Sequence, residues 1–239
     1  MTMASWVGAQ LRPDAPGFWL ALDLLVAAAL WMLPVRYGRR ETLARPLRWI
    51  VLPSMALLAG ALSPQALGLA GIHWQAGITL GLGIVLGLLL LLALVRLTVR
   101  EPAGDPQEAA GSAASLYALL YGGAQQFHWC FQRGALLALF VSLAALPAAA
   151  MRAPVYWATW VAVLIALPGL LFVAPGLPRL YTGIALVATA ILFFYTRNFW
   201  LCWALHSGIL AFAGVAWLRP ELKPAATPQR TGVKDARKR

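Results

Sequence analysis

The sequence predicts an all-α protein, a polytopic transmembrane helix bundle of about seven spans with its N-terminus outside and its C-terminus in the cytoplasm. Three observations lead there: the composition, the length of the apolar stretches and the distribution of Lys and Arg. Of the 239 residues, 61% are apolar and 11% are charged, whereas an average soluble domain is about 45–50% apolar and about 25% charged. This composition excludes an ordinary soluble domain, a disordered chain, a collagen-like repeat and a disulfide scaffold. The net charge of +11 accompanies long Leu, Ala and Gly runs, so we expect the lipid bilayer and not nucleic acid as the partner.

Seven apolar stretches are close to the length of about 20 residues that a helix needs to cross a bilayer. They are Phe18–Val35, Trp49–Leu69, Gln75–Leu97, Leu116–Leu146, Val155–Val173, Leu180–Tyr195 and Phe199–Leu218. The connections between them are short. We therefore predict one transmembrane domain over residues 1–218, followed by a disordered basic tail over residues 219–239.

The orientation follows from Lys and Arg, which collect on the cytoplasmic side of membrane proteins. With seven alternating spans, fifteen of the nineteen cations fall on the side of the C-terminal tail and three on the other side, with Arg133 inside a span. This predicts a cytoplasmic C-terminus. Basic loops at a cytoplasmic face also attract anionic lipid headgroups, at about 1 kcal/mol per cation.

Polar side chains within spans are costly, so each one indicates a function or a partner. The span Leu116–Leu146 is the most unusual, because Gln125, His128 and Gln132 recur on one helical face. The full set of candidates for a polar cavity or site is Asp23, Gln125, Gln126, His128, Gln132, Arg133, Asn198, Cys202, His206 and Ser207. A structural role remains open for them, since Gln and His form hydrogen bonds between membrane helices. Arg133 could likewise be the counter-ion of Asp23, the only carboxylate within a span.

Two segments resemble the CAAX-protease and bacteriocin-processing (Abi) family of intramembrane proteases. Residues 128–134 read His-Trp-Cys-Phe-Gln-Arg-Gly, similar to the family motif in which a Glu pair precedes Arg and Gly. Residues 196–206 read Thr-Arg-Asn-Phe-Trp-Leu-Cys-Trp-Ala-Leu-His, similar to a late family motif that ends in His. Phe172 to Pro178 fit a third motif, with Gly176 where the family has His.

The resemblance implies a helical intramembrane fold and, in the family, a water activated by Glu and His for attack on a peptide bond. This chain keeps Arg133 and His206. It departs from the family at the Glu pair, replaced by His128 and Trp129, at the middle His, replaced by Gly176, and at a late Asn, replaced by Leu210. A general base needs a titratable group close to the water, so the preferred function is a non-peptidase scaffold or a subunit that binds a membrane-protein or peptide partner.

Two alternatives from other classes stay open. The first is an active intramembrane hydrolase with an altered catalytic set of Asp23, His128, Arg133 and His206, in which Arg133 stabilises an oxyanion. The second is a metal, haem or pigment protein with His128, Cys202 and His206 as ligands, although the preferred function requires no cofactor. We expect an integral membrane location, in a bacterial inner membrane.

Overall fold

The computed structural model describes residues 2–32, 38–98, 112–145, 152–173 and 176–213, and helices are the only regular secondary structure in those ranges. The helices are α1 (Met3–Gln10), α2 (Pro16–Met32), α3 (Gly38–Leu58), α4 (Trp74–Thr98), α5 (Ser112–Ala144), α6 (Pro154–Ala166), the 3₁₀ helix η2 (Leu167–Phe172), α7 (Leu177–Thr196) and α8 (Phe199–Ala213). The all-α class is thus confirmed. Each predicted apolar stretch overlaps one of α2 to α8.

Within the described ranges, four helical segments are long and apolar enough to cross a membrane: Trp74–Leu94, Ala118–Ala144, Pro154–Leu171 and Pro178–Thr196. The apolar parts of α2, α3 and α8 are shorter, at Pro16–Leu30, Leu47–Leu58 and Phe199–Phe212. Large apolar side chains lie exposed on the outside of the bundle, including Leu82, Leu86 and Leu90 of α4. An apolar outer surface of this kind suits lipid as the surrounding solvent.

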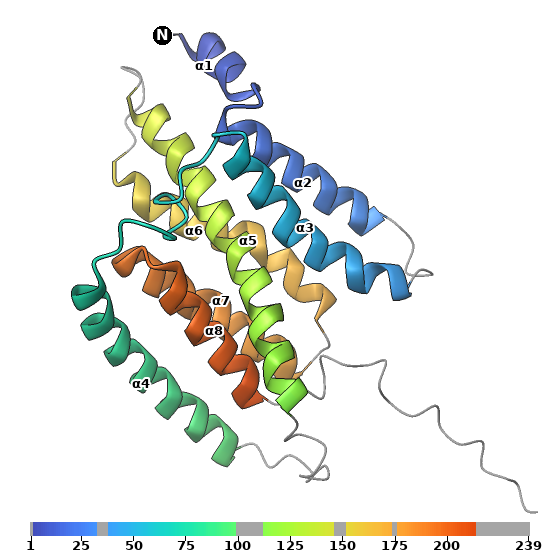
Figure 1. Ribbon diagram of the computed structural model, residues 1–239, viewed down its shortest axis with the longest axis vertical. Coiled ribbons are helices and arrows are strands. Elements are labelled where there is room, and N and C mark those ends of the chain that lie inside the picture. The colour runs from blue at the N-terminus through green and yellow to red at the C-terminus, as the bar shows by residue number, and fades with distance from the viewer. Residues whose placement is uncertain (1, 33–37, 99–111, 146–151, 174–175, 214–239) are drawn as a thin grey trace, which may run out of the picture.

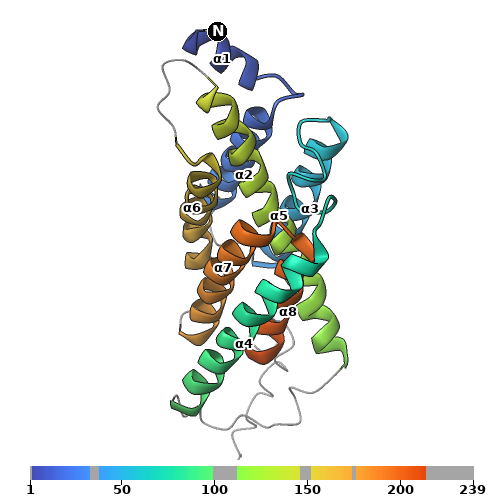
Figure 2. The same ribbon diagram turned by 90° about the vertical axis from the view of Figure 1, so that its left-hand side faces the viewer.

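Helix α5 is the centre of the bundle (Figure 1). It packs against α8, α6, α3 and α2, while α7 packs against α8 and α6. Helix α4 lies at the edge and contacts α7 and α8 (Figure 2). Each face of α5 therefore meets a different pair of helices, which decides where its polar side chains go.

The prediction for residues 49–69 is wrong at both ends. Helix α3 begins at Gly38 and ends at Leu58, so Arg48 belongs to a helix and not to a loop. After Leu58 the chain turns and runs across α5, with Leu62 and Leu67 buried. Irregular backbone at membrane depth is tolerated only where protein covers it or water reaches it, and here the buried leucines pack with Phe131 and Ala135.

Two glycines allow this segment, residues 59–73, to pack closely. A Cβ on Gly134 of α5 would lie 3.0 Å from the Ala66 carbonyl oxygen. The lack of a side chain at Gly134 therefore lets the backbone of the segment approach α5 closely. Gly68 has φ of +73°, and a Cβ there would lie 2.5 Å from the Arg197 carbonyl oxygen. The amide of Phe199 donates to the Gly68 carbonyl at 2.9 Å, which attaches the segment to the start of α8.

Two further differences concern the ends of elements. Helix α1 lies in a region for which no helix is expected, and its Trp6 indole donates to Ser142 Oγ at 3.1 Å. Residues 155–173, expected as one span, change from α6 to a 3₁₀ turn at Pro168, because proline has no amide hydrogen for the helix to use. The predicted tail, residues 219–239, lies outside the described residues.

Candidate functional site

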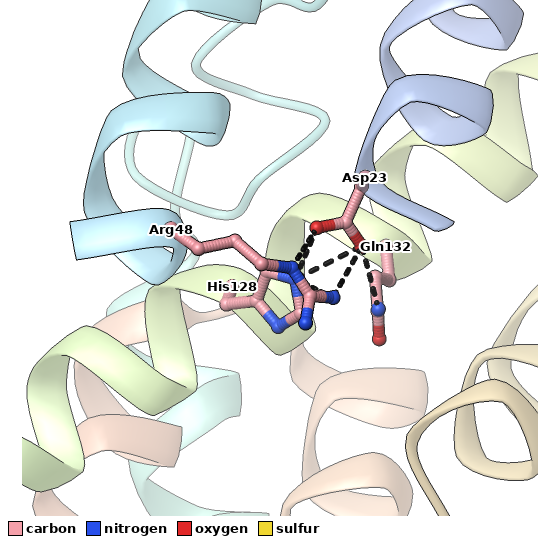
Figure 3. A network of polar contacts seen from close by, with 4 residues as sticks. All are labelled: Asp23, Arg48, His128 and Gln132. Carbon is pink, nitrogen blue, oxygen red and sulfur yellow. Dashed lines mark hydrogen bonds and ion pairs between the residues drawn. The ribbon is translucent and has the colours of Figure 1, made fainter. Parts of the chain in front are cut away.

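An ion pair between Asp23 of α2 and Arg48 of α3 lies against α5 (Figure 3). The Arg48 guanidinium meets the Asp23 carboxylate through two N–H groups of one edge, Nε donating to Oδ1 at 2.7 Å and Nη2 to Oδ2 at 3.0 Å. Asp23 is fully buried, and the Arg48 side chain is 14% exposed. Two-point pairing of this kind is the strongest form of charge-assisted hydrogen bond.

Helix α5 supplies the other two partners of this carboxylate. Gln132 donates from Nε2 to Asp23 Oδ2 at 3.1 Å. His128 Nε2 lies 2.9 and 3.0 Å from the two carboxylate oxygens and 3.2 Å from Arg48 Nη2. A bare Nε2 would direct its lone pair at the carboxylate, so we assign the ring proton to Nε2, donating to Asp23. All four side chains then form one closed network.

A second buried polar cluster lies on the other side of α5, against α7 and α8. Arg133 is fully buried and donates to two α7 carbonyls, those of Thr189 at 3.3 Å and Leu186 at 3.4 Å, and to Thr189 Oγ1 at 3.3 Å. Its guanidinium carbon also lies 5.6 Å from the centre of the Phe193 ring, within the range of a cation–π contact. Among the described residues no carboxylate pairs with it.

His206 of α8 belongs to this second cluster. Its ring stacks flat on Trp129, with centroids 4.7 Å apart and an interplanar angle of 3°. The Thr189 carbonyl accepts hydrogen bonds from both Arg133 and Cys202, and Cys202 lies one turn before His206 on α8. The structure therefore brings Arg133 and His206 into one region between α5, α7 and α8.

The expected pairing of Arg133 with Asp23 is wrong. Successive residues on a helix are about 100° apart, so His128 and Gln132 project toward α2 and α3 while Trp129 and Arg133 project toward α7 and α8. Asp23 contacts the first pair. The side chains expected to share one cavity are divided between two networks on different faces of α5.

The remaining candidates have local roles. Asn198 Oδ1 accepts the amide of Leu201 at 3.2 Å and so caps the start of α8. Gln126 Nε2 donates to Cys130 Sγ at 3.3 Å within α5. Cys202 Sγ donates weakly to the Thr189 carbonyl at 3.5 Å. The Oε1 atom of Gln125 is buried without a hydrogen-bond partner in the described structure.

The metal-ligand set expected from the sequence does not assemble. His128 is held by Asp23 and His206 by Trp129, and within the described ranges no three His, Cys, Asp or Glu side chains are placed to hold a metal ion. Two residues of these networks, Arg48 and Thr189, are not predicted from the sequence. Arg48 directly precedes the predicted span that begins at Trp49, and Thr189 is an ordinary residue of an apolar helix, so neither carried a signal in the sequence.

Two surface pockets are apolar. One lies over α3, α5 and α8, encloses about 280 Å³ and is lined by Ile50, Leu119, Leu120, Gly123, Ala124, Phe127, Phe199, Trp200 and Trp203. The other encloses about 270 Å³ between α4, α7 and α8. No titratable side chain lines either of them, so neither brings a substrate to an acid or a base.

Comparison with known proteins gives no relative. No family model, no curated protein and no solved structure matches the chain. Of the residues in the resemblance, Arg133 and His206 lie in one cluster, whereas Gly176 is exposed at the residue before α7 begins.

Proposed function

We propose that this protein binds a membrane-embedded partner and does not cleave it. In this proposal the chain is a non-peptidase relative of the CAAX-protease family, with seven spans, its N-terminus outside and its C-terminus in the cytoplasm of a bacterial inner membrane. The four long apolar helices and the uneven distribution of Lys and Arg support the membrane part of the proposal.

The observation that carries the proposal is the apolar lining of the pocket over α3, α5 and α8. We call this pocket the lateral groove. Ala124 lines it as a small residue, with Phe127 and Trp200 beside it, and the Trp203 indole packs directly against Gly123. Small residues let a second helix approach closely in lipid, where tight packing drives association. The groove therefore suits an apolar transmembrane helix of a partner protein.

The polar networks argue against hydrolysis. Asp23 is the one buried carboxylate among the described side chains, and Arg48, His128 and Gln132 already occupy its oxygens. It contacts the α2 and α3 side of α5, whereas His206 lies on the α7 and α8 side. A general base must reach its water directly or through one water molecule, and among the described side chains His206 has no carboxylate beside it to serve as that base.

Photo-crosslinking in native membranes tests the proposal. A photoreactive phenylalanine analogue replaces Leu120, which lines the groove and is 62% exposed, and in a separate variant it replaces Leu86 of α4, which is 58% exposed. We expect a discrete protein adduct from position 120 and lipid adducts alone from position 86. Lipid adducts alone from both positions would contradict the proposal that the groove binds a partner protein.

A further inference from the structure

A column of buried polar atoms without protein partners runs along the contact between α5 and α8. We call this contact the seam. Gln126 Oε1, Ser207 Oγ and both ring nitrogens of His206 have no hydrogen-bond partner within the described chain. Gln126 and His206 are fully buried, and Ser207 is 7% exposed. Buried polar atoms are nearly always hydrogen-bonded in native proteins, so a group of four in one place needs an explanation.

The contacts around these atoms place them between the two helices. Ser207 Oγ points at α5, because a Cβ on Gly122 would lie 2.9 Å from it. About two helical turns further along α5, His206 stacks on Trp129. Gln126 lies between these two levels on α5 and is held along the helix by its bond to Cys130.

A second observation in the same region is the buried charge of Arg133. Its guanidinium lies among acceptors of α7 and has no carboxylate partner in the described part of the chain. It is one turn from Trp129, on which His206 stacks, along the same face of α5. A buried cation without a counter-ion is costly unless polar groups or solvent surround it. A bound polar molecule would stabilise both the unpartnered atoms of the seam and the buried charge of Arg133.

We propose that the α5–α8 seam is an internal hydration site that binds water between Gln126, His206 and Ser207, beside Arg133. Water is the class of guest that fits, because a neutral imidazole has one donor and one acceptor nitrogen while Gln126 Oε1 only accepts. An anion would face the lone pairs of Gln126 and His206, and Arg133 repels a cation. Neither of the two apolar surface pockets includes these atoms, and a polar site between two packed helices suits a guest of water size.

Water-edited solid-state NMR of the whole protein in lipid bilayers tests this site. With ¹⁵N-labelled histidine, the His206 signals are identified by their loss in His206→Phe. We expect magnetisation from water protons to reach the His206 ring nitrogens. Exposed His73 is the positive control and the fully buried Ala185 amide, labelled separately, is the negative control. Transfer to His206 no faster than to Ala185 would overturn the proposal.

Thermal unfolding in detergent supplies a second readout. Ser207→Ala removes a partner from bound water and should lower the midpoint relative to Thr159→Val, whose hydroxyl is buried but already donates to Val155 at 2.9 Å. In a dry seam the same change would remove an unpartnered hydroxyl, so an unchanged or higher midpoint contradicts bound water. A midpoint that rises with chloride, but not with gluconate at equal ionic strength, would make the guest an anion and also overturn the proposal.

Discussion

Asp23 keeps its place in the bundle because donors from two other helices surround its carboxylate. Arg48 of α3 supplies the neutralising charge, and His128 and Gln132 of α5 supply further hydrogen bonds. Removal of one partner from a buried ion pair leaves an uncompensated charge, at a cost of about 3–5 kcal/mol. Loss of both charges together avoids this cost.

Removal of Arg48 alone should therefore harm the protein more than removal of the whole pair. We expect Arg48→Met to lower the free energy of unfolding by about 3–5 kcal/mol, and Asp23→Asn in the same chain to restore most of the loss. Thermal unfolding of the parent, both single variants and the double variant in detergent gives the coupling. Additive single effects would show that the pair carries no stabilising interaction.

The sequence showed that Asp23 needs a partner but did not identify it. Arg133 was a candidate partner because it lies inside a predicted span, whereas Arg48 directly precedes the predicted span that begins at Trp49. A long Arg side chain can extend along apolar surface from a helix end, so position along the sequence does not fix where its charge lies. Arg133 uses backbone carbonyls of α7 in place of a carboxylate, and such partners leave no mark in a sequence.

At the scale of elements, the segment over residues 59–73 depends on Gly68. Both Gly68 and Gly60 have positive φ, of +73° and +71°, but only Gly68 has a neighbour where a Cβ would go. Comparison of substitutions at the two glycines therefore distinguishes the cost of a positive φ from the cost of a steric clash. Positive φ costs a residue with a Cβ about 1–2 kcal/mol, and Gly68 adds the clash with the Arg197 carbonyl.

Gly68→Ala should destabilise the protein clearly more than Gly60→Ala. Gly60→Ala should show the φ cost of about 1–2 kcal/mol alone, and Gly68→Ala should also weaken the contact of the segment with α8. Thermal midpoints in detergent and protease accessibility of the segment measure the two effects. Equal midpoints for the two variants would mean that the close approach to Arg197 does not exist.

Helix α4 is attached through glycines on one face only. A Cβ on Gly81 would touch Leu201 and Leu192 at 3.4 and 3.5 Å, whereas a Cβ on Gly83 would meet nothing within 4 Å. Gly81→Leu should therefore push α4 from α7 and α8 and lower the thermal midpoint, while Gly83→Leu should leave it nearly unchanged. A larger loss of thermal midpoint from Gly83→Leu than from Gly81→Leu would show that the Gly83 face of α4, and not the Gly81 face, packs against the bundle.

The sequence predicted the existence and type of these elements better than their ends. Long apolar runs located α4, α5 and α7 to within a few residues. The ends of α3 were missed because a hydropathy pattern describes burial and not helix geometry. The polar start of α3 is helical, and the apolar residues after Leu58 are buried as irregular backbone.

At the scale of the whole molecule, the proposed orientation assigns opposite sides of the membrane to the exposed Ser63 and to Thr231 of the basic tail. Both native cysteines are buried, so added cysteines can be labelled selectively. In intact cells we expect a membrane-impermeant maleimide to label Ser63→Cys, and to label Thr231→Cys only after permeabilisation. The reverse pattern, or labelling of both from outside, would contradict the proposed topology.

The central claim is that the bundle holds a partner helix and leaves it intact. The most direct test is the mass of the partner captured from Leu120 by photo-crosslinking, measured in the parent chain and again with His206→Ala. We predict that both chains capture the same partner at the same, uncleaved mass. A shorter partner on the parent chain that becomes full length with His206→Ala would show that the protein cuts what it binds.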